Sequence, residues 1–181
     1  GKDPYSASKA AAEISISAYS RSFFDSKRQP IQVTSTRAGN VIGGGDWALN
    51  RIVPDSIRAW SNNSSVKIRN QFSTRPWQHV LEPISGYLRL GELMYKNKNL
   101  HGESFNFGPN PYNTKSVKEL VEAMEKYWPN AKHNIQNLSE INSQKEAQLL
   151  KLNCDKSYEK LNWQPVLDFE ETIEITTKWY F

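Results

Sequence analysis

The fold class is decided by residues 4–46, which read PYSASKAAAEISISAYSRSFFDSKRQPIQVTSTRAGNVIGGGD. The leading proline favours the first turn of a helix, and the residues after it lack an internal Pro or Gly, so we predict a helix to about Lys27. The β-branched run 31–37 then predicts a strand. That strand leads into the glycine-rich segment 38–46, for which we predict an irregular loop. A helix, a strand and a glycine-rich loop in succession are typical of an α/β protein.

Beyond this stretch, helical patterns continue to alternate with strand patterns. Ser116 and Glu119 have the spacing of a capping box, and Asp168 and Glu171 repeat it. We predict further helices over 51–60, 83–97, 116–127 and from 168 onward, and further strands over 66–69 and 103–108. Residues 130–142 are polar and carry no clear pattern. The alternation again favours an α/β fold.

The composition excludes several classes of protein. Of the 181 residues, 38% are hydrophobic and 12% aromatic, which excludes a mainly disordered chain. No apolar run approaches the ~20 residues of a membrane span, and no run of like charges accompanies the net charge of +4. We therefore expect neither a membrane nor a nucleic-acid partner. The single cysteine, Cys154, excludes an intramolecular disulfide and fits a reducing cytoplasm. Because His79, His101 and His133 are far apart in sequence, we expect no metal site.

Tyr5 and Lys9 are the first candidates for chemistry. They are four residues apart on a predicted helix, so their side chains share one face. A tyrosine that acts as a base near neutral pH must lose a proton with a reference pKa of ~10, and a neighbouring ammonium favours that loss. By chance alone, a chain of this composition contains about one such pair. The spacing by itself therefore leaves a plain surface pair open.

Five segments in this chain occur in an order that one family shares. They are PYSASK at 4–9, TRAGNVIG at 36–43, RPWQHV at 75–80, SFNFG at 104–108 and LNWQP at 161–165. Together they resemble the extended short-chain dehydrogenases/reductases, over essentially the whole chain. The resemblance implies an α/β architecture, the C-terminal part of a Rossmann-type fold with a smaller α/β substrate-binding domain. It assigns residues 1–42 and 77–112 to the remainder of the NAD-binding domain, and 43–76 and 113–181 to the sugar-nucleotide-binding domain.

The same resemblance implies roles for individual residues. Tyr5 is the expected base that deprotonates a sugar hydroxyl, while Lys9 lowers its pKa and hydrogen-bonds the nicotinamide ribose. Gly39 is expected near the nicotinamide. Arg75 is the preferred residue for the substrate diphosphate, because a planar guanidinium matches phosphate geometry. The full set of expected substrate-binding residues is Asn40, Arg51, Arg69, Arg75 and Asn106.

The implied activity is NAD-dependent 4,6-dehydration of a nucleotide sugar to a 4-keto-6-deoxy product for deoxysugar and surface polysaccharide synthesis. Segments 38–47 and 75–80 most resemble family members that act on a CDP-linked hexose. The resemblance also implies a cytoplasmic homo-oligomer that associates through the helix beginning at Tyr5. Three alternatives remain open: another nucleotide-sugar dehydratase, a 4-epimerase, and a truncated, noncatalytic nucleotide-sugar-binding fragment.

One expected element is missing from the sequence. No Gly-x-x-Gly-x-x-Gly turn opens a strand–helix unit, although such a turn holds the cofactor pyrophosphate. We therefore expect the N-terminal dinucleotide-binding half, with the acid and base of the elimination step, to lie upstream of residue 1, and the chain alone to be inactive. We also expect Trp77, Trp163 and Trp179 to anchor cores, and Cys154 to be inert packing.

Overall fold

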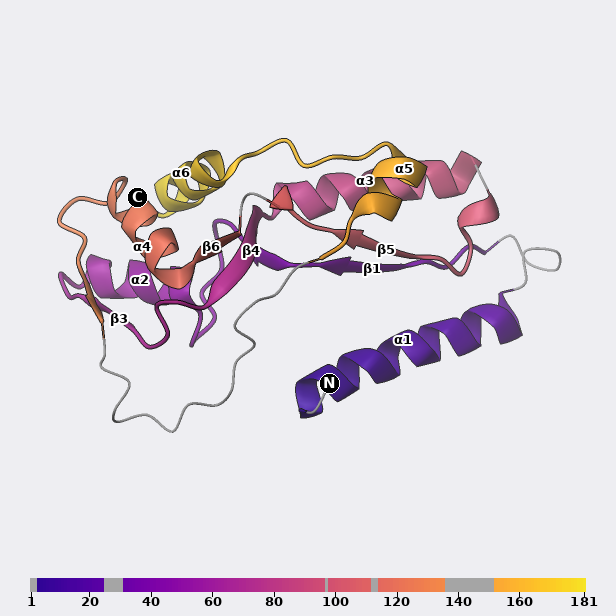
Figure 1. Ribbon diagram of the computed structural model, residues 1–181, viewed down its shortest axis with the longest axis horizontal. Helices are drawn as coiled ribbons and strands as arrows, with labels where there is room; N and C mark the ends of the chain where they lie inside the picture. The colour runs from indigo at the N-terminus through magenta and orange to yellow at the C-terminus, as the bar shows by residue number, and fades with distance from the viewer. Residues whose placement is uncertain (1–2, 25–30, 97, 112–113, 136–151) are drawn as a thin grey trace. The chain divides into compact units, whose positions relative to one another are not determined.

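The computed structural model describes residues 3–24, 31–96, 98–111, 114–135 and 152–181 (Figure 1). Its contacts divide the chain into two compact units. The first unit comprises Gly1–Arg37, Ile84–Phe107 and Cys154–Gln164, and the second comprises Ala38–Pro83, Gly108–Asn153 and Pro165–Phe181. Each unit has a separate hydrophobic core, so each is described by itself.

The first unit is built around a two-stranded sheet of β1 and β5, which lies between α3 and α1 (Figure 1). Gly86 of α3 packs against the Phe107 ring at the end of β5, where a Cβ on the glycine would lie 2.2 Å from a ring carbon. This close approach requires glycine. The elements of the unit are α1 (Pro4–Phe23), β1 (Ser35–Ala38), α3 (Leu81–Lys96, which begins in the second unit), the 3₁₀ turn η1 (Lys98–Leu100), β5 (Ser104–Phe107) and α5 (Asp155–Leu161).

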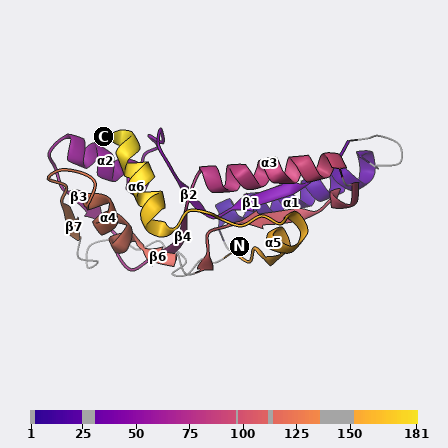
Figure 2. The ribbon, with the colours of Figure 1, turned by 90° about the horizontal axis from the view of Figure 1, so that it is seen from above.

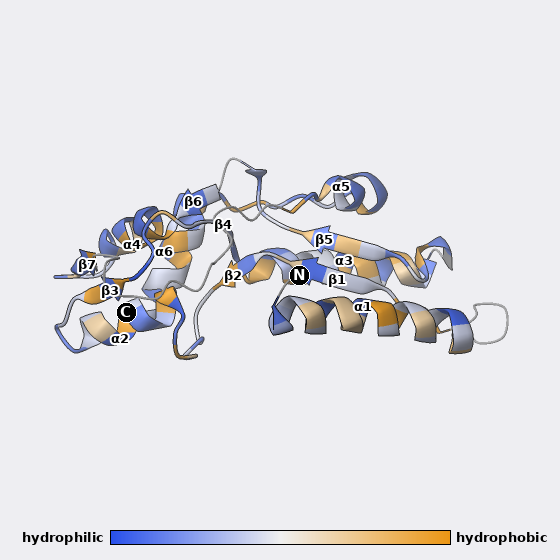
Figure 3. Cartoon of the chain, turned by 60° about the horizontal axis from the view of Figure 1, so that its bottom comes forward, coloured by the Kyte–Doolittle hydropathy of each residue, from blue (hydrophilic) through white to orange (hydrophobic). Residues whose placement is uncertain are grey.

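Helix α1 begins as the sequence predicts. The Asp3 side chain caps it by accepting a hydrogen bond from Ser6 N at 2.9 Å, with Pro4 in the first turn. The helix ends at Phe23 rather than near Lys27, and residues 25–30 lie outside the described part of the chain. Ser20 is its one buried residue, and Figure 3 shows hydrophobic residues, in orange, at intervals along the helix.

In its described residues, the second unit contains two small sheets and three helices. Strand β4 lies between β2, which it pairs with in parallel, and β6, which it pairs with antiparallel, while β3 and β7 form a separate parallel pair. Helices α4 and α6 lie side by side (Figure 2). The elements are β2 (Asn40–Ile42), α2 (Ile52–Ser61), β3 (Val66–Ile68), β4 (Thr74–His79), β6 (Thr114–Ser116), α4 (Val117–Glu125), β7 (His133–Ile135) and α6 (Phe169–Tyr180).

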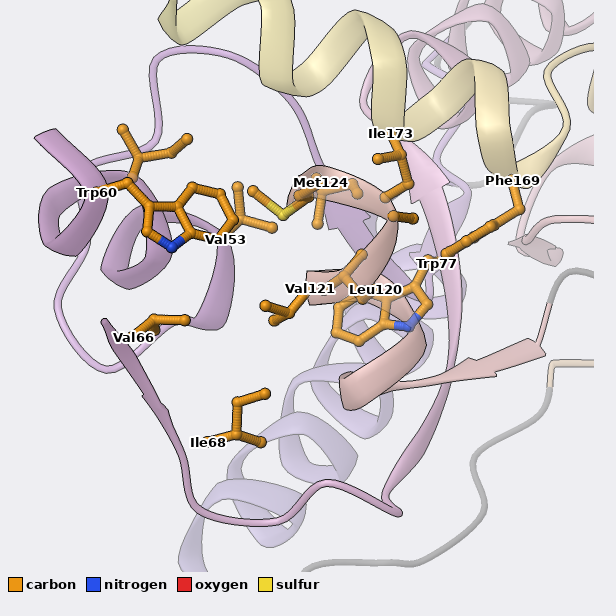
Figure 4. Close-up of a cluster of buried hydrophobic side chains, with 13 residues drawn as sticks. Val53, Trp60, Val66, Ile68, Trp77, Leu120, Val121, Met124, Phe169 and Ile173 are labelled. Atoms are coloured by element: carbon orange, nitrogen blue, oxygen red, sulfur yellow. The ribbon is translucent and has the colours of Figure 1, made fainter. Parts of the chain in front are cut away.

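The core of the second unit joins its helices to its strands (Figure 4). Trp77 of β4 is 5% exposed and packs among side chains from α4 and α6. The core residues include Val53, Trp60, Val66, Ile68, Trp77, Leu120, Val121, Met124, Phe169 and Ile173. Both helices that face Trp77 begin with the predicted capping boxes, Ser116–Glu119 and Asp168–Glu171.

Two segments contain strands that the sequence does not predict. The sequence predicts no element over residues 74–79, where a polar stretch runs to Arg75 and Pro76, but these residues form β4, the central strand of its sheet. The sequence hides this strand because it includes Pro76 and because Trp77, Gln78 and His79 are all buried, which removes the alternation of an amphipathic strand. The predicted loop 38–46 likewise contains β2, which is only three residues long and depends on pairing with β4.

The remaining expected elements occur within a few residues of their predicted ends, and α5, β6 and β7 are additional. The predicted domains stay a prediction; the two compact units divide the chain differently at 38–42, 77–83, 108–112 and 154–164. Segment 77–83 belongs to the second unit because β4 pairs with β2 and β6. Residues 154–164 belong to the first unit because Leu161 and Trp163 complete its core.

Candidate functional site

Tyr5 and Lys9 lie on the same face of α1, one turn apart. The Lys9 Nζ atom lies 5.5 Å from the centroid of the Tyr5 ring. Tyr5 is 72% exposed, so its phenol is open to an external ligand. Hydrogen bonds from Ser6 to Asp3 and from Ser8 Oγ to the Tyr5 carbonyl oxygen, at 2.7 Å, hold the first turn. The helix therefore presents an ammonium beside a phenol, an arrangement suited to proton transfer.

Glu13 lies one further turn along α1 and is held by strand β1. Arg37 donates to it with two nitrogens, Nε to Oε1 and Nη2 to Oε2, both at 2.8 Å. Ser35 Oγ also donates to Oε2 at 2.9 Å. The hydrogen bonds from Arg37 lower the pKa of the Glu13 carboxyl despite partial burial, and Glu13 in turn raises the pKa of Arg37. Sequence reasoning missed Glu13, although its spacing of four from Lys9 could have indicated it.

Asn106 of β5 joins this polar cluster. Its side-chain oxygen accepts a hydrogen bond from Arg37 Nη1 at 3.3 Å, and its carbonyl oxygen accepts one from Ser157 Oγ at 2.6 Å. Of the predicted site residues, Tyr5, Lys9 and Asn106 belong to the first unit, while Gly39, Asn40, Arg51, Arg69 and Arg75 belong to the second.

Asn40 and Arg75 come from neighbouring strands of the second unit. Asn40 begins β2 and pairs in register with Trp77, and Arg75 lies two residues before Trp77 on β4. On the other side of β4, Arg75 pairs in register with Lys115 of β6. Two cationic side chains thus lie opposite each other on adjacent strands, where like charges repel, and the Lys115 ammonium lies 3.5 Å from a Glu119 carboxylate oxygen.

Gly39 connects β1 to β2 in a crowded position. A Cβ at this residue would lie 3.2 Å from Pro76 Cγ and 3.3 Å from Leu152 Cδ1. The lack of a side chain thus serves the packing of the backbone against Pro76. Because Gly39 has no side chain, only its backbone could contact a nicotinamide, as the resemblance implies.

The two weaker arginine candidates are more exposed. Arg51 precedes α2, its side chain is 65% exposed, and it lies 3.5 Å from Asp46. Arg69 directly follows β3 and is exposed. Both side chains can reach a ligand, but neither is held in one geometry as firmly as Arg37 is.

The aromatic predictions have different outcomes. Trp77 and Trp163 are each 5% exposed and donate through Nε1 to Lys115 O and Ser85 Oγ, which confirms them as core anchors. For Trp179 the prediction is wrong, since it is 60% exposed. Its ring covers Gly44, where a Cβ would lie 2.1 Å from a ring carbon. Cys154 is buried as expected.

The C-terminal helix also holds the glycine-rich loop. The Tyr180 hydroxyl donates to the carbonyl oxygen of Asp46 at 2.8 Å and lies 3.1 Å from that of Gly43. Partial burial raises the pKa of the Tyr180 phenol. Because Asn40 lies only three residues before Gly43, α6 stabilises the loop that follows a candidate binding residue.

Two further kinds of feature were sought in the described ranges. No helix there is both long and apolar enough to cross a bilayer. Across the same ranges, no three His, Cys, Asp or Glu side chains gather into a group that could hold a metal ion.

Comparison with known proteins gives consistent results. The sequence is 42% identical to CDP-glucose 4,6-dehydratase of Salmonella typhimurium over 99% of this chain and 50% of that protein. It is 26% identical to dTDP-glucose 4,6-dehydratase of Haemophilus influenzae over 98% of this chain and 51% of that protein. The chain thus spans about half the length of the curated relatives it matches.

Solved structures support the same fold. A dTDP-glucose 4,6-dehydratase from Bacillus anthracis, in complex with NAD, matches 99% of this chain and 52% of its own, with a TM-score of 0.73 at 22% identity. An epimerase from Methanothermobacter thermautotrophicus matches 98% of this chain and 49% of its own, with a TM-score of 0.78 at 20% identity. The sequence profile of GDP-mannose 4,6 dehydratase matches residues 1–176. The chain therefore belongs to the GDP-mannose 4,6 dehydratase family.

Proposed function

We propose that this chain takes part in the NAD-dependent conversion of CDP-glucose to CDP-4-keto-6-deoxyglucose and water. The 42% identity to a CDP-glucose 4,6-dehydratase supports the choice of substrate. The observation that carries the proposal is the exposed Tyr5 phenol with the Lys9 ammonium 5.5 Å from its ring.

The proton step is assigned to Tyr5. Its ionised oxygen accepts the proton of the sugar 4-hydroxyl, and the Lys9 ammonium stabilises the anion by direct Coulomb attraction. The C4 ketone formed in this step is kept while water is lost across C5 and C6 and the hydride returns to C6, so the proton that Tyr5 accepts does not go back to the C4 oxygen. Together with the hydroxide lost from C6, it accounts for the water released. The acid and base that remove water are proposed to lie outside this chain.

The diphosphate is assigned to the second unit. Arg75 and Lys115 are opposite each other in the β4–β6 pair, and two positive charges at this place would attract a diphosphate. Asn40 can donate its side-chain amide to a phosphate oxygen. Arg51 and Arg69 are proposed to contact the nucleotide, and Asn106 the substrate.

The residues present fit one end of NAD. Tyr5 and Lys9 are exposed and can hydrogen-bond a nicotinamide ribose, and the Gly39 backbone is the proposed neighbour of the ring. The turn that would hold the pyrophosphate does not occur in the sequence. When bound, NAD supplies the acceptor and donor of the hydride that moves from C4 to C6.

The biological setting is part of the same proposal. A cytoplasmic homo-oligomer that associates through α1 would fit the exposed apolar side chains of that helix, among them Ile14 at 70% and Tyr19 at 60% exposure. The 4-keto-6-deoxy product would feed deoxysugar synthesis for surface polysaccharide.

The decisive experiment uses the complete gene product with CDP-glucose, and follows by NMR the replacement of the C6 hydroxymethyl signal by a methyl signal. Tyr5→Phe should lower turnover by about 10²-fold or more while CDP-glucose binding is retained. Tyr19→Phe is the matched control, because Tyr19 lies on the same exposed helix. Unchanged turnover in Tyr5→Phe would remove Tyr5 from the mechanism.

Parallel assays with dTDP-, GDP- and UDP-hexoses test the nucleotide. Preferential turnover of one of these would replace CDP-glucose as the substrate. If the complete protein binds these compounds but converts none, the function is ligand binding alone.

A further inference from the structure

Lys9 has two neighbours on α1 that would draw its ammonium in opposite directions. Tyr5 lies four residues before it and Glu13 four residues after it, so both are one turn away on the same face. An ammonium forms an ion pair with a carboxylate more readily than it approaches a neutral phenol. On an isolated helix, therefore, Lys9 would be drawn toward Glu13 and away from Tyr5.

In the folded unit, the Glu13 carboxylate is already bound. Arg37 contacts both of its oxygens at 2.8 Å, and Ser35 Oγ contacts Oε2 at 2.9 Å. Arg37 is itself oriented by its third contact, to the Asn106 side chain. Bidentate pairing of this kind fixes the direction of the carboxylate as well as neutralising its charge. The Lys9 ammonium lies over the Tyr5 ring instead.

We propose that Arg37 and Glu13 are positioning residues that keep the Lys9 ammonium on Tyr5, with Arg37 binding and neutralising the carboxylate that would otherwise compete for Lys9. The inference rests on the proposed function of Tyr5 as a base. To the proposed function, the inference adds a role for Arg37 of β1. This residue acts on the Tyr5 phenol only through Lys9 and contacts neither the phenol nor the substrate.

The charged groups around the pair are few in the described chain. On α1 itself they are Lys9, Glu13 and the cap residue Asp3, whose carboxylate accepts from Ser6 N and Ser6 Oγ. Arg37 is the charged group that β1 directs at this face, and β5 contributes the uncharged Asn106 and Ser104. Glu103, directly before β5, lines a cavity with Glu13 and is paired with Lys156, and His101 contacts Ser20 further along α1. Asp3 is unchanged in every variant below, so its effect on Tyr5 cancels in each comparison.

The test measures ionisation of Tyr5 directly in this 181-residue chain. Tyrosine labelled with ¹³C at the ζ carbon is titrated by NMR, and Tyr5→Phe assigns the Tyr5 signal. Arg37→Gln should raise the pH of half-deprotonation of Tyr5 by about 0.3 of a pH unit, the size expected for losing one exposed i,i+4 contact. The double variant Glu13→Gln/Arg37→Gln should return it to the wild-type value.

A double-mutant cycle of Arg37 with Lys9 distinguishes this mechanism from a direct electrostatic effect of the Arg37 charge on the Tyr5 phenol. In a Lys9→Met background, Arg37→Gln should leave the Tyr5 midpoint unchanged. Arg21→Gln, which removes a charge from the last turn of α1, is the control for general charge loss and should have no effect. A shift from Arg37→Gln that persists without Lys9, or no shift at all, overturns the proposal.

Folding is checked by circular dichroism for every variant. If Arg37→Gln does not fold, Arg37→Lys replaces it, because a single ammonium cannot bind both carboxylate oxygens in the same fork and should give a smaller upward shift. The titration needs no turnover. If the complete protein had no dehydratase activity, the proposed function would be refuted. The Tyr5 titration would still test the role of Arg37 by itself.

Discussion

The two units of the chain are stabilised in different ways. Among the described residues, the second unit buries 13 apolar residues in one cluster, while the first buries six. Helix α1 of the first unit is attached chiefly by polar contacts, Glu13 to Arg37 and Ser20 to His101. A cavity of about 20 Å³, lined by Glu13, Thr34 and other residues, lies along the same side of the helix. Charged and polar contacts therefore hold the helix that carries the residues proposed for proton transfer. Apolar packing holds the strands that carry the residues proposed for phosphate binding.

The largest effect is expected from the core of the second unit. Leu120 is fully buried between Trp77 and α6. Leu120→Ala should lower the free energy of unfolding by about 2–5 kcal/mol, because it removes apolar contacts and leaves a cavity. Hydrogen exchange should show the loss of protection first in the second unit. Leu88→Ala, at a residue 71% exposed, is the control and should change stability by less than about 0.5 kcal/mol. Equal loss of protection in both units would show that the two cores unfold together.

A smaller effect is expected from two glycines on α3. Gly86→Ala would place a Cβ 2.2 Å from the Phe107 ring, so it should destabilise the first unit by about 1–3 kcal/mol. Gly91 is the matched control, because among the described residues nothing but its chain neighbours and the backbone of its own helix lies within 4 Å of its Cβ position. Gly91→Ala should stabilise the helix by about 0.5–1 kcal/mol. Chemical denaturation of both variants gives the comparison, and equal effects would contradict the packing described for Gly86.

Next in size is the contact between α6 and the glycine-rich loop. Tyr180→Phe removes the hydroxyl that contacts the carbonyl oxygens of Gly43 and Asp46. The free energy of unfolding should fall by about 1 kcal/mol, and affinity for CDP-glucose, measured by calorimetry, should fall with it. Tyr95→Phe, at a residue 92% exposed, should change neither quantity. If Tyr180→Phe left the affinity for CDP-glucose unchanged, the glycine-rich loop would not contribute to binding of this ligand.

The smallest effect is a difference in pH response between the units. Burial lowers the pKa of His79 in the second unit from 6.5, against the opposing charge of Glu82. The unfolded state then binds more protons below pH 6.5, so this contribution to stability is present above that pH and is lost as the pH falls. For Glu13 of the first unit, whose pKa is lowered from 4.5 chiefly by Arg37, the loss begins only below pH 4.5.

Hydrogen exchange at several pH values measures this difference. His79→Gln should flatten the response of the second unit as the pH falls through 6.5, where His79 of the unfolded chain takes up its proton before His79 of the folded chain does. Glu13→Gln should leave that range unchanged and alter the protection of α1 in more acidic solution. If the first unit lost protection before the second as the pH falls, the assignment of these responses to His79 and Glu13 would be wrong.

Much of the secondary structure was predictable because its signals are local. The caps at Asp3, Ser116 and Asp168 depend on residues within one turn, and each begins a helix where the sequence places it. The strands β2 and β4 were missed because their pairing with each other, rather than their own residues, makes them strands. Trp179 was misassigned because exposure of a large ring depends on what covers it, and in this case it covers Gly44.

The sequence by itself determined the α/β class, the family motifs and the placing of Tyr5 and Lys9 on one helical face, because helical periodicity alone relates residues four apart. Tertiary structure decided what surrounds that pair. Glu13 and Arg37 are 24 residues apart in sequence, and only the docking of α1 on β1 joins them. Register between strands likewise brings Arg75 opposite Lys115. Such contacts depend on the whole fold because no local pattern specifies which distant charges will meet.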